Sequence, residues 1–270
     1  MIDPIKYYRE WPVHKQLRHD RLLLYLWPLF ATGLSLWWSA EFFTSLLLFF
    51  GLPLLYLCFQ NPLKIKKTIL FSLSTLVIVI VLDYICVATG IWLVENSVIG
   101  FRLLGYVTIE NIIWLPIYTM FIIMFYEYFY EYGDTDYSYR PRLKYLYILF
   151  GVILLGFLLI YFINEQWLYI NYWYLKFGVI LVLLPIILTL STKPKLFNKF
   201  LKVGVYFFYS SFLYEITALH LNQWVFPGGG IVGRFSLGQM WFPIEELFFW
   251  MILGAMGILS YYEFFDDDGK

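Results

Sequence analysis

Histidine, cysteine and charged residues are scarce in this chain of 270 residues. The three histidines are His14, His19 and His220, so membrane di-iron hydroxylases, desaturases and ketolases, which need many histidine ligands, are excluded. The two cysteines, Cys58 and Cys86, lie in apolar stretches without CxxC spacing, and we expect no disulfide or metal role for them. The net charge is zero, which gives no sign of nucleic-acid binding.

Several cofactor signatures are also missing. The glycine-rich stretch PGGGIVG (residues 227–233) lies in a predicted loop between spans, whereas a dinucleotide motif follows a strand and opens a helix. The last apolar run, Trp241–Tyr261, has no lysine that could hold retinal. The aspartate-rich motifs of Mg²⁺–diphosphate prenyltransferases are absent from the spans. We therefore predict no cofactor and no metal ion.

Apolar residues dominate instead. The chain is 61% hydrophobic and 14% charged, with a mean hydropathy of +0.70. Soluble domains are about half apolar and about a quarter charged, so we predict an all-α integral membrane protein of the cell membrane. A span needs roughly 17–25 apolar residues. Eight runs qualify: Leu22–Trp38, Glu41–Phe59, Ile69–Ala88, Tyr106–Tyr126, Tyr145–Ile163, Tyr172–Leu190, Leu201–Leu221 and Trp241–Tyr261.

Loop charges predict the orientation. We expect no cleavable signal peptide, because residues 1–21 form a polar, basic tail without an apolar core. With eight spans, that tail and the loops NPLKIKK, YRPRLKY and STKPKLFNK fall on one side. All but three of the 19 lysines and arginines are then on that side; the exceptions are Arg102, Lys176 and Arg234. The positive-inside rule places both termini, including the acidic tail 263–270, in the cytoplasm.

Two stretches of the chain are alike: LDYICVATGIWLVENSVIGFRLLGYVTIENIIW (residues 82–114) and LYEITALHLNQWVFPGGGIVGRFSLGQMWFPIEELFF (residues 213–249). In each, an acid (Asp83, Glu215) is followed nine residues later by a tryptophan (Trp92, Trp224). Glycine, arginine, glycine and glutamate then follow in order: Gly100, Arg102, Gly105 and Glu110, then Gly233, Arg234, Gly238 and Glu245. This pattern predicts two parallel four-span repeats, residues 22–144 and 145–262.

The repeat places four acids within spans, toward the non-cytoplasmic side: Asp83, Glu110, Glu215 and Glu245. Carboxyl groups inside a membrane are rare and mostly functional. Removal from water disfavours the ionised form of a carboxyl group, and a neutral carboxylic acid can donate a proton. We expect Glu245 to face inward.

Two roles are possible for several residues of this group and its surroundings. Glu246, adjacent to Glu245, either orients that residue or pairs with Arg234. Asp83 and Glu215 act in catalysis or simply bond to neighbouring helices. Arg102 and Arg234 either orient the acids or anchor the chain at the membrane interface. We expect three acids at cytoplasmic span ends to be solvated: Glu127, Glu131 and Glu263.

Aromatic residues make up 23% of the chain. Most fit an interfacial belt or a lipid-facing surface. Those near the acids are candidate substrate-binding residues, because aromatic faces can stabilise a carbocation. They are Trp92, Trp114, Trp224, Trp241, Phe248 and Phe249. A proton donor in an aromatic-walled apolar site suits an acid-initiated isomerisation or cyclisation of a polyene, which is redox-neutral.

The motif FPIEELFF, set within the repeated pattern of acid, tryptophan, glycine and Ile-Glu, resembles the lycopene cyclase domain family. The resemblance is to the membrane type built from two small subunits or fused in one chain, and it extends from Leu22 onward. It implies conversion of the linear ψ ends of lycopene to β-ionone rings, with Glu245, Glu246 and Glu110 as the matching motif acids. The first copy departs from the motif: Thr108 replaces its proline, and Asn111, a further candidate substrate-binding residue, replaces its second glutamate.

This reading implies a carotenoid substrate in the lipid bilayer, with other enzymes of carotenoid biosynthesis as further candidate partners. Related members cyclise longer carotenoids or form ε or γ rings. Two other classes remain open: a proton-coupled transporter of a small lipophilic substrate, and a non-enzymatic membrane scaffold. A cyclase should have a closed, elongated apolar groove that opens laterally to lipid and ends at Glu245 and Glu110. A transporter should have a wet central cavity that faces one aqueous side.

Overall fold

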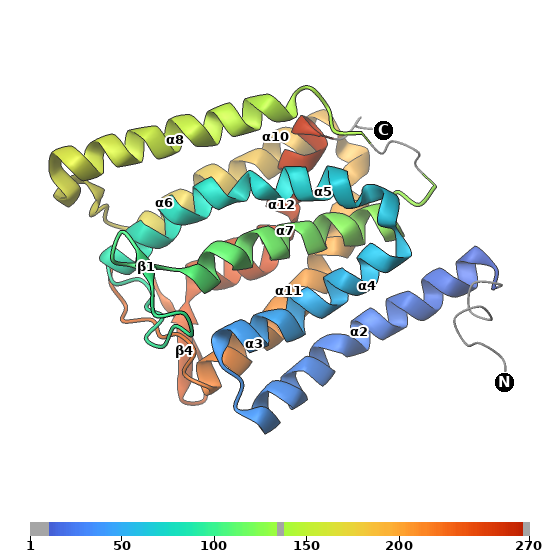
Figure 1. Cartoon of the computed structure of the whole chain (residues 1–270), viewed down its shortest axis with the longest axis horizontal. Coiled ribbons are helices and arrows are strands. Elements are labelled where there is room, and N and C mark those ends of the chain that lie inside the picture. Colours follow the sequence, from blue (N-terminus) through green and yellow to red (C-terminus); the bar gives the residue numbers. More distant parts are fainter. Residues whose placement is uncertain (1–10, 134–137, 267–270) are drawn as a thin grey trace.

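The computed structural model describes residues 11–133 and 138–266, and in these ranges eight helical rods lie side by side in one bundle (Figure 1). Several rods are continuous in direction but change helix type along their length. The rods are α2 (Val13–Trp38); α3 (Phe42–Leu46), η1 (Leu47–Gly51) and α4 (Leu52–Gln60); η2 (Pro62–Lys64), α5 (Ile65–Leu73) and α6 (Thr75–Ala88); α7 (Ile109–Phe129); α8 (Leu143–Asn164) and η3 (Glu165–Leu168); α9 (Trp173–Phe177), η4 (Gly178–Leu183) and α10 (Leu184–Thr192); η5 (Pro194–Leu196) and α11 (Phe197–His220); and η6 (Glu246–Ile252) and α12 (Gly254–Phe265).

Several of these rods are long and apolar enough to cross a membrane, which confirms the predicted helical, membrane-type architecture. Among the described residues, five meet this test: Phe42–Gln60, Pro62–Ala88, Ile109–Phe129, Leu143–Leu168 and Trp173–Thr192. A sixth candidate joins η6 and α12, which are bent by 49° relative to each other. Helices α2 and α11 coincide with two predicted spans but lie outside this set, so the count of eight spans stays a prediction.

Helix α7 forms the centre of the bundle. It packs against α4, α5, α6, α11 and α12. Every residue from Tyr118 to Phe129 is buried, as expected for a helix that is apolar on all sides. Thr108 caps the helix: its Oγ1 accepts a hydrogen bond from the backbone N–H of Asn111 at 3.3 Å. The cap therefore fixes the start of α7 at Ile109 and places Glu110 and Asn111 in its first turn.

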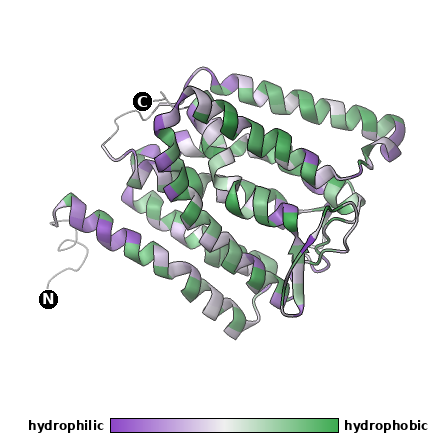
Figure 2. Ribbon diagram, turned by 180° about the vertical axis from the view of Figure 1, so that it is seen from behind, coloured by the Kyte–Doolittle hydropathy of each residue, from purple (hydrophilic) through white to green (hydrophobic). Residues whose placement is uncertain are grey.

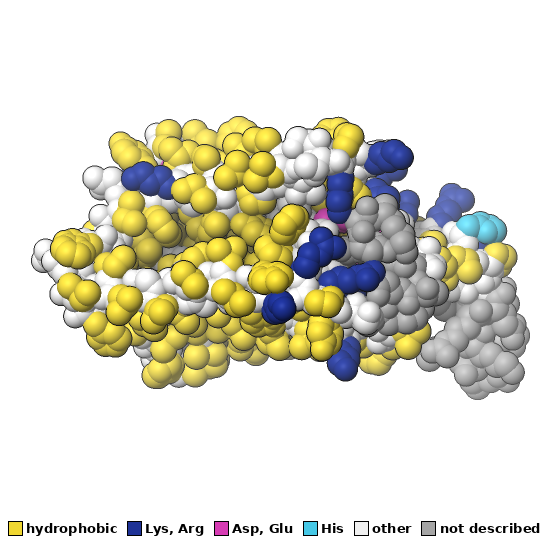
Figure 3. Space-filling model, turned by 90° about the horizontal axis from the view of Figure 1, so that it is seen from above, with side chains coloured by type: hydrophobic (Ala, Val, Ile, Leu, Met, Phe, Trp, Pro, Cys, Tyr) yellow, Lys and Arg dark blue, Asp and Glu magenta, His cyan; other side chains and the backbone are white. Residues whose placement is uncertain are grey.

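Helix α8 contrasts with α7, because about half of its apolar side chains are exposed and only Leu143, Leu146, Phe150 and Phe157 are buried. Hydrophobic residues predominate along most helices of the bundle (Figure 2). Seen from above, the surface is mostly hydrophobic, and lysine and arginine side chains gather mainly toward one end (Figure 3). A lipid-facing surface accounts for such exposure, whereas a soluble monomer rarely exposes apolar patches of this size.

Two short hairpins gather at the end of the bundle to the left in Figure 1. Strands β1 (Arg102–Leu103) and β2 (Val107–Thr108) are antiparallel, as are β3 (Arg234–Leu237) and β4 (Met240–Pro243). The loops before them join directly, because Leu93 and Val225 exchange two backbone hydrogen bonds of 2.9 Å. Gly229 also donates to the carbonyl of Gly90 at 2.9 Å, and a Cβ at Gly229 would lie 2.3 Å from the Thr89 oxygen. Only glycine permits that approach.

Buried ion pairs lie on the side of the basic loops. Lys64 Nζ lies 2.6 Å from Glu127 Oε2, and both side chains are almost fully buried. The Tyr262 hydroxyl also donates to Glu127, and Lys193 Nζ lies 3.6 Å from Glu263 Oε2. The expectation that Glu127 and Glu263 are solvated is therefore wrong, because neighbouring lysines and tyrosines cover and pair them.

The remaining acid of that group and the two predicted tails also need correction. Glu131 is partly buried and accepts a hydrogen bond from Lys199. Helix α2 begins at Val13, so residues 13–21 of the predicted N-terminal tail are helical. Helix α12 continues to Phe265, so the first residues of the predicted acidic tail, 263–265, are helical as well. Residues 1–10 and 267–270 of these tails lie outside the described residues.

The contact between η4 and η6 yields a stability test. A Cβ placed on Gly178 would lie 2.2 Å from the ring of Phe249, whereas one on Gly156 of α8 would meet nothing within 4 Å. We expect Gly178→Ala to lower the free energy of unfolding by about 1–3 kcal/mol through overpacking. Gly156→Ala should cause no loss, because alanine favours a helix interior. Denaturant unfolding in detergent measures both variants, and equal stabilities would contradict the contact.

Candidate functional site

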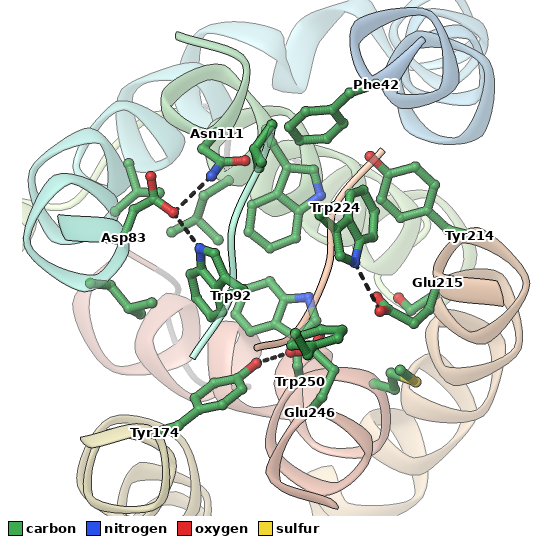
Figure 4. Close-up of a pocket in the computed structure, with 18 of the residues that line it drawn as sticks. Phe42, Asp83, Trp92, Asn111, Tyr174, Tyr214, Glu215, Trp224, Glu246 and Trp250 are labelled. Atoms are coloured by element: carbon green, nitrogen blue, oxygen red, sulfur yellow. Dashed lines mark hydrogen bonds between the residues drawn. The ribbon is translucent and has the colours of Figure 1, made fainter. Parts of the chain in front are cut away.

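A cavity of about 90 Å³ lies among the helices beside the two loops (Figure 4). Its walls are mostly aromatic and aliphatic, and three carboxyl groups stand among them. The lining residues are Phe42, Phe50, Val79, Leu82, Asp83, Trp92, Val94, Asn111, Trp114, Leu115, Tyr174, Ser211, Tyr214, Glu215, Trp224, Phe226, Glu246, Trp250 and Met251.

The first carboxyl group is that of Asp83, on the last turn and a half of α6. Its Oδ1 accepts two hydrogen bonds of 2.7 Å, one from Trp92 Nε1 and one from Asn111 Nδ2. The chain leaves α6 and turns back, which brings a tryptophan nine residues later against the acid. Asp83 Oδ2 is buried and has no hydrogen-bond partner among the described residues.

The other two carboxyl groups come from the second half of the chain. Glu215 of α11 accepts a hydrogen bond of 2.9 Å from Trp224 Nε1, again a tryptophan nine residues later. Glu246, at the start of η6, accepts a hydrogen bond from the Tyr174 hydroxyl of α9. Both carboxyl groups are buried, with Glu215 5% and Glu246 6% exposed. Three acids are thereby held in one apolar space.

Glu110 and Glu245 bind loop backbone instead of lining the cavity. Glu110 Oε1 accepts from the N–H of Val98 at 2.6 Å, and Glu245 Oε1 accepts from the N–H of Val232 at 2.6 Å. Ser97 Oγ also lies 2.9 Å from Glu110 Oε2. Each glutamate therefore holds, by a backbone hydrogen bond, the loop that precedes its own helix.

The expected inward orientation of Glu245 is therefore wrong. Adjacent helical positions point about 100° apart, so only one of the two neighbouring glutamates can face the cavity. The loop amide of Val232 holds Glu245, and Glu246 is the residue that lines the cavity. Glu246 is bonded to Tyr174 rather than to Arg234.

The two arginines lie outside the cavity, and in the described ranges neither forms an ion pair with a carboxylate. Arg102 donates to the carbonyls of Val94, Glu95 and Tyr106, which fixes the first hairpin to its loop. The Arg234 guanidinium lies 4.1 Å from the ring centre of Trp241. The predicted role in orienting the acids is not seen for either residue.

The predicted aromatic residues divide into two groups. Trp92, Trp114 and Trp224 line the cavity. Three others do not: Trp241 lies under Arg234, Phe248 is 50% exposed, and Phe249 packs on Gly178. Asn111 lines the cavity and bonds to Asp83.

Several lining residues are absent from the sequence-based prediction, most notably Tyr174, Trp250, Tyr214 and Ser211. Trp250 lies four residues after Glu246, so helical spacing from that acid could have identified it. Its ring centre is 4.6 Å from that of Trp114. No comparable signal points to Tyr174, since its element approaches the acids only in the folded bundle.

Two further buried polar atoms at the cavity have no hydrogen-bond partner among the described residues: Trp114 Nε1 and the Tyr214 hydroxyl. Buried polar atoms are normally paired, so these two atoms are free to bond to water or to a bound molecule. Within residues 11–133 and 138–266, no group of three or more histidine, cysteine, aspartate or glutamate side chains is arranged to hold a metal ion.

Comparisons of this chain with protein-family models, with curated proteins and with solved structures find no match.

The different placement of the two adjacent glutamates predicts different effects on stability. We expect Glu245→Ala to lower the free energy of unfolding by about 1.5–3 kcal/mol, because the Val232 amide loses a charged acceptor. Glu246→Gln should change it by less than about 1 kcal/mol, because the amide oxygen still accepts from Tyr174. Denaturant unfolding in detergent measures both. A larger loss for Glu246→Gln than for Glu245→Ala would contradict the assignment.

Proposed function

We propose that this chain is a carotenoid cyclase that converts the acyclic ψ end groups of lycopene to β-ionone rings within the membrane. The observation that carries the proposal is the convergence of Asp83, Glu215 and Glu246 on one aromatic-walled cavity. Such a site offers carboxyl groups for proton transfer and apolar walls for a hydrocarbon. The resemblance of the FPIEELFF motif to the lycopene cyclase domain points to the same reaction.

The reaction needs one proton added and one removed. A neutral carboxyl group, Glu246 or its neighbour Glu215, protonates the terminal alkene of the end group. The resulting cation is attacked by the next alkene, which closes the six-membered ring and moves the positive charge to a ring carbon. A base then removes a ring proton and forms the ring double bond, so the product is an isomer of the substrate.

The aromatic walls suit the intermediate of this reaction. Trp114 and Trp250 lie with ring centres 4.6 Å apart, and Trp92 and Tyr174 with ring centres 5.4 Å apart. Aromatic faces attract a carbocation, and they do not remove a proton from it before the ring has closed. Carbocations also react with water, so a mainly apolar lining protects the intermediate.

We also propose the two-repeat, eight-span architecture, with α2 and α11 as the remaining spans and both termini cytoplasmic. Matching contacts support it. Asp83 pairs with Trp92 as Glu215 pairs with Trp224, and Glu110 and Glu245 each bind a loop amide. Leu93 and Val225 each follow the repeated tryptophan by one residue, and they form a backbone bridge with each other. Two matching residues that pair in this way are expected next to a pseudo-two-fold axis that relates residues 22–144 to residues 145–262.

The topology can be tested with single cysteines in a Cys58→Ser/Cys86→Ser background. Phe101 lies in an exposed loop beside β1, and Lys66 is an exposed residue of α5, so each is replaced by cysteine in turn. With an even number of spans, we expect a membrane-impermeant maleimide to label only Phe101→Cys in intact cells. Lys66→Cys should react only after the membrane is opened. Labelling of both from outside would contradict the proposed orientation.

A proton-coupled transporter of a small lipophilic substrate would use the same buried carboxyl groups. The mainly aromatic and aliphatic lining favours the cyclase, because a transporter of this kind needs a wet cavity open to one side. A non-enzymatic scaffold gives no reason for three carboxyl groups to share an apolar space. Cyclisation of a longer carotenoid, or formation of an ε or γ ring, would use the same site.

The proposal is tested in a lycopene-accumulating host that expresses the chain. We expect pigment chromatography to show β-carotene or a one-ringed intermediate. Glu246→Gln should reduce ringed product about 100-fold or more, since it breaks the pair of carboxyl groups that retains the proton. Glu245→Gln is the matched control and should retain activity, because its amide oxygen still accepts from Val232. Unchanged lycopene with membrane-inserted wild-type protein would argue against a lycopene cyclase.

A further inference from the structure

The two halves of the cavity are built alike but carry different chemistry. In the first half, Asp83 is bonded to a tryptophan and to the amide of Asn111. In the second half, Glu215 is bonded to a tryptophan, and the position that matches Asn111 is Glu246. One wall therefore holds one carboxyl group with an amide, and the other wall holds two carboxyl groups.

The surroundings of Asp83 suit a base. Two N–H groups, Trp92 Nε1 and Asn111 Nδ2, both donate to Oδ1 at 2.7 Å, and such donors offset part of the penalty that burial places on a carboxylate. Oδ2 is buried and without a partner among the described residues, so one oxygen is left to accept a proton. The amide of Asn111 can donate but has no acidic proton of its own to share.

The surroundings of Glu215 and Glu246 suit an acid. Two carboxyl groups buried in one apolar site cannot both ionise without a large electrostatic cost, so the pair retains a proton. Figure 4 shows Asp83 on one side of the pocket and Glu215 and Glu246 on another, with Trp92 and Trp250 between them. An end group in this space would have an acid on one side and a base on the other.

We infer that Asp83 is the base that removes the ring proton, while the Glu215–Glu246 pair supplies the proton that starts cyclisation. This inference rests on the proposed function. One C–H bond forms at the terminal alkene from the carboxyl proton, and one C–C bond closes the ring. The ring C–H bond then breaks, its electrons form the double bond, and the proton goes to Asp83 Oδ2. Asp83 then loses this proton to solvent, and the pair takes up a new proton from solvent, which resets the site.

The position of Asp83 also fixes the product in this scheme. β, ε and γ rings arise from the same cation and differ only in which neighbouring carbon loses its proton. A carboxylate held by two fixed donors can reach only one of these protons efficiently. Asn111 is then a positioning residue, because it acts through Asp83 and not on the substrate.

Deuterium exchange separates the two roles. Membrane vesicles that contain the protein and lycopene are incubated in D₂O, and both pigments are analysed by mass spectrometry. In the wild type, each new ring should carry one deuterium. Asp83→Asn should reduce ringed product about 100-fold or more, yet deuterium should appear in recovered lycopene, because the cation returns a proton to the glutamate pair. Glu246→Gln should give neither ring nor deuterium.

Asn111→Asp provides a second test that keeps Asp83. It removes one donor and places a second acid beside the base, so we expect less ringed product with deuterium still entering lycopene. Asn96→Asp, the same change at an exposed loop position, should behave as wild type. If Asp83→Asn does not reach the membrane, Asn111→Asp decides the matter.

The outcomes distinguish this inference from the proposed function. If the wild type forms no ring from lycopene or another acyclic carotenoid, the proposed function fails. If the wild type cyclises and Asp83→Asn or Asn111→Asp cyclises at the same rate, Asp83 is not the base. If membrane-inserted Asp83→Asn gives neither ring nor deuterium, Asp83 acts at or before protonation, which also overturns the inference.

Discussion

Every carboxyl group buried in this bundle needs a hydrogen-bond donor, and that constraint organises the molecule. Unpaired charges in an apolar interior are very costly, so the surrounding elements are arranged to supply donors. Tryptophans of the loops reach Asp83 and Glu215, and loop amides reach Glu110 and Glu245. On the side of the basic loops, Lys64 pairs with Glu127. The acids thus tie the loops to the helices.

Much of the fold was predictable from hydropathy, because apolar runs of span length have few alternatives to a helix. Each helical rod overlaps a predicted run, although the start of the run Trp241–Tyr261 belongs to strand β4 and not to a helix. The helix boundaries near α2 and α12 were not predictable, since polar residues there are buried by partners from distant parts of the chain. Glu263 is an example, because Tyr126 and Lys193 cover it only in the folded bundle.

The candidate site was predictable in part. The repeated spacing of acid and tryptophan identified Asp83, Trp92, Glu215 and Trp224, which all line the cavity. It could not separate Glu245 from Glu246, because that choice depends on which carboxyl group the Val232 amide meets. No local sequence pattern could have identified Tyr174, because it lies 72 residues before Glu246, its partner in the folded protein.

The most direct test of the central claim uses purified protein in lipid vesicles with lycopene as the only addition. We predict a new pigment with the mass of lycopene and the chromatographic and absorption properties of a ringed carotenoid, because cyclisation is redox-neutral. Such a product should be absent with Glu246→Gln. Wild-type protein that leaves lycopene and other acyclic carotenoids chemically unchanged, or only moves a lipophilic substrate across the bilayer, would contradict the claim.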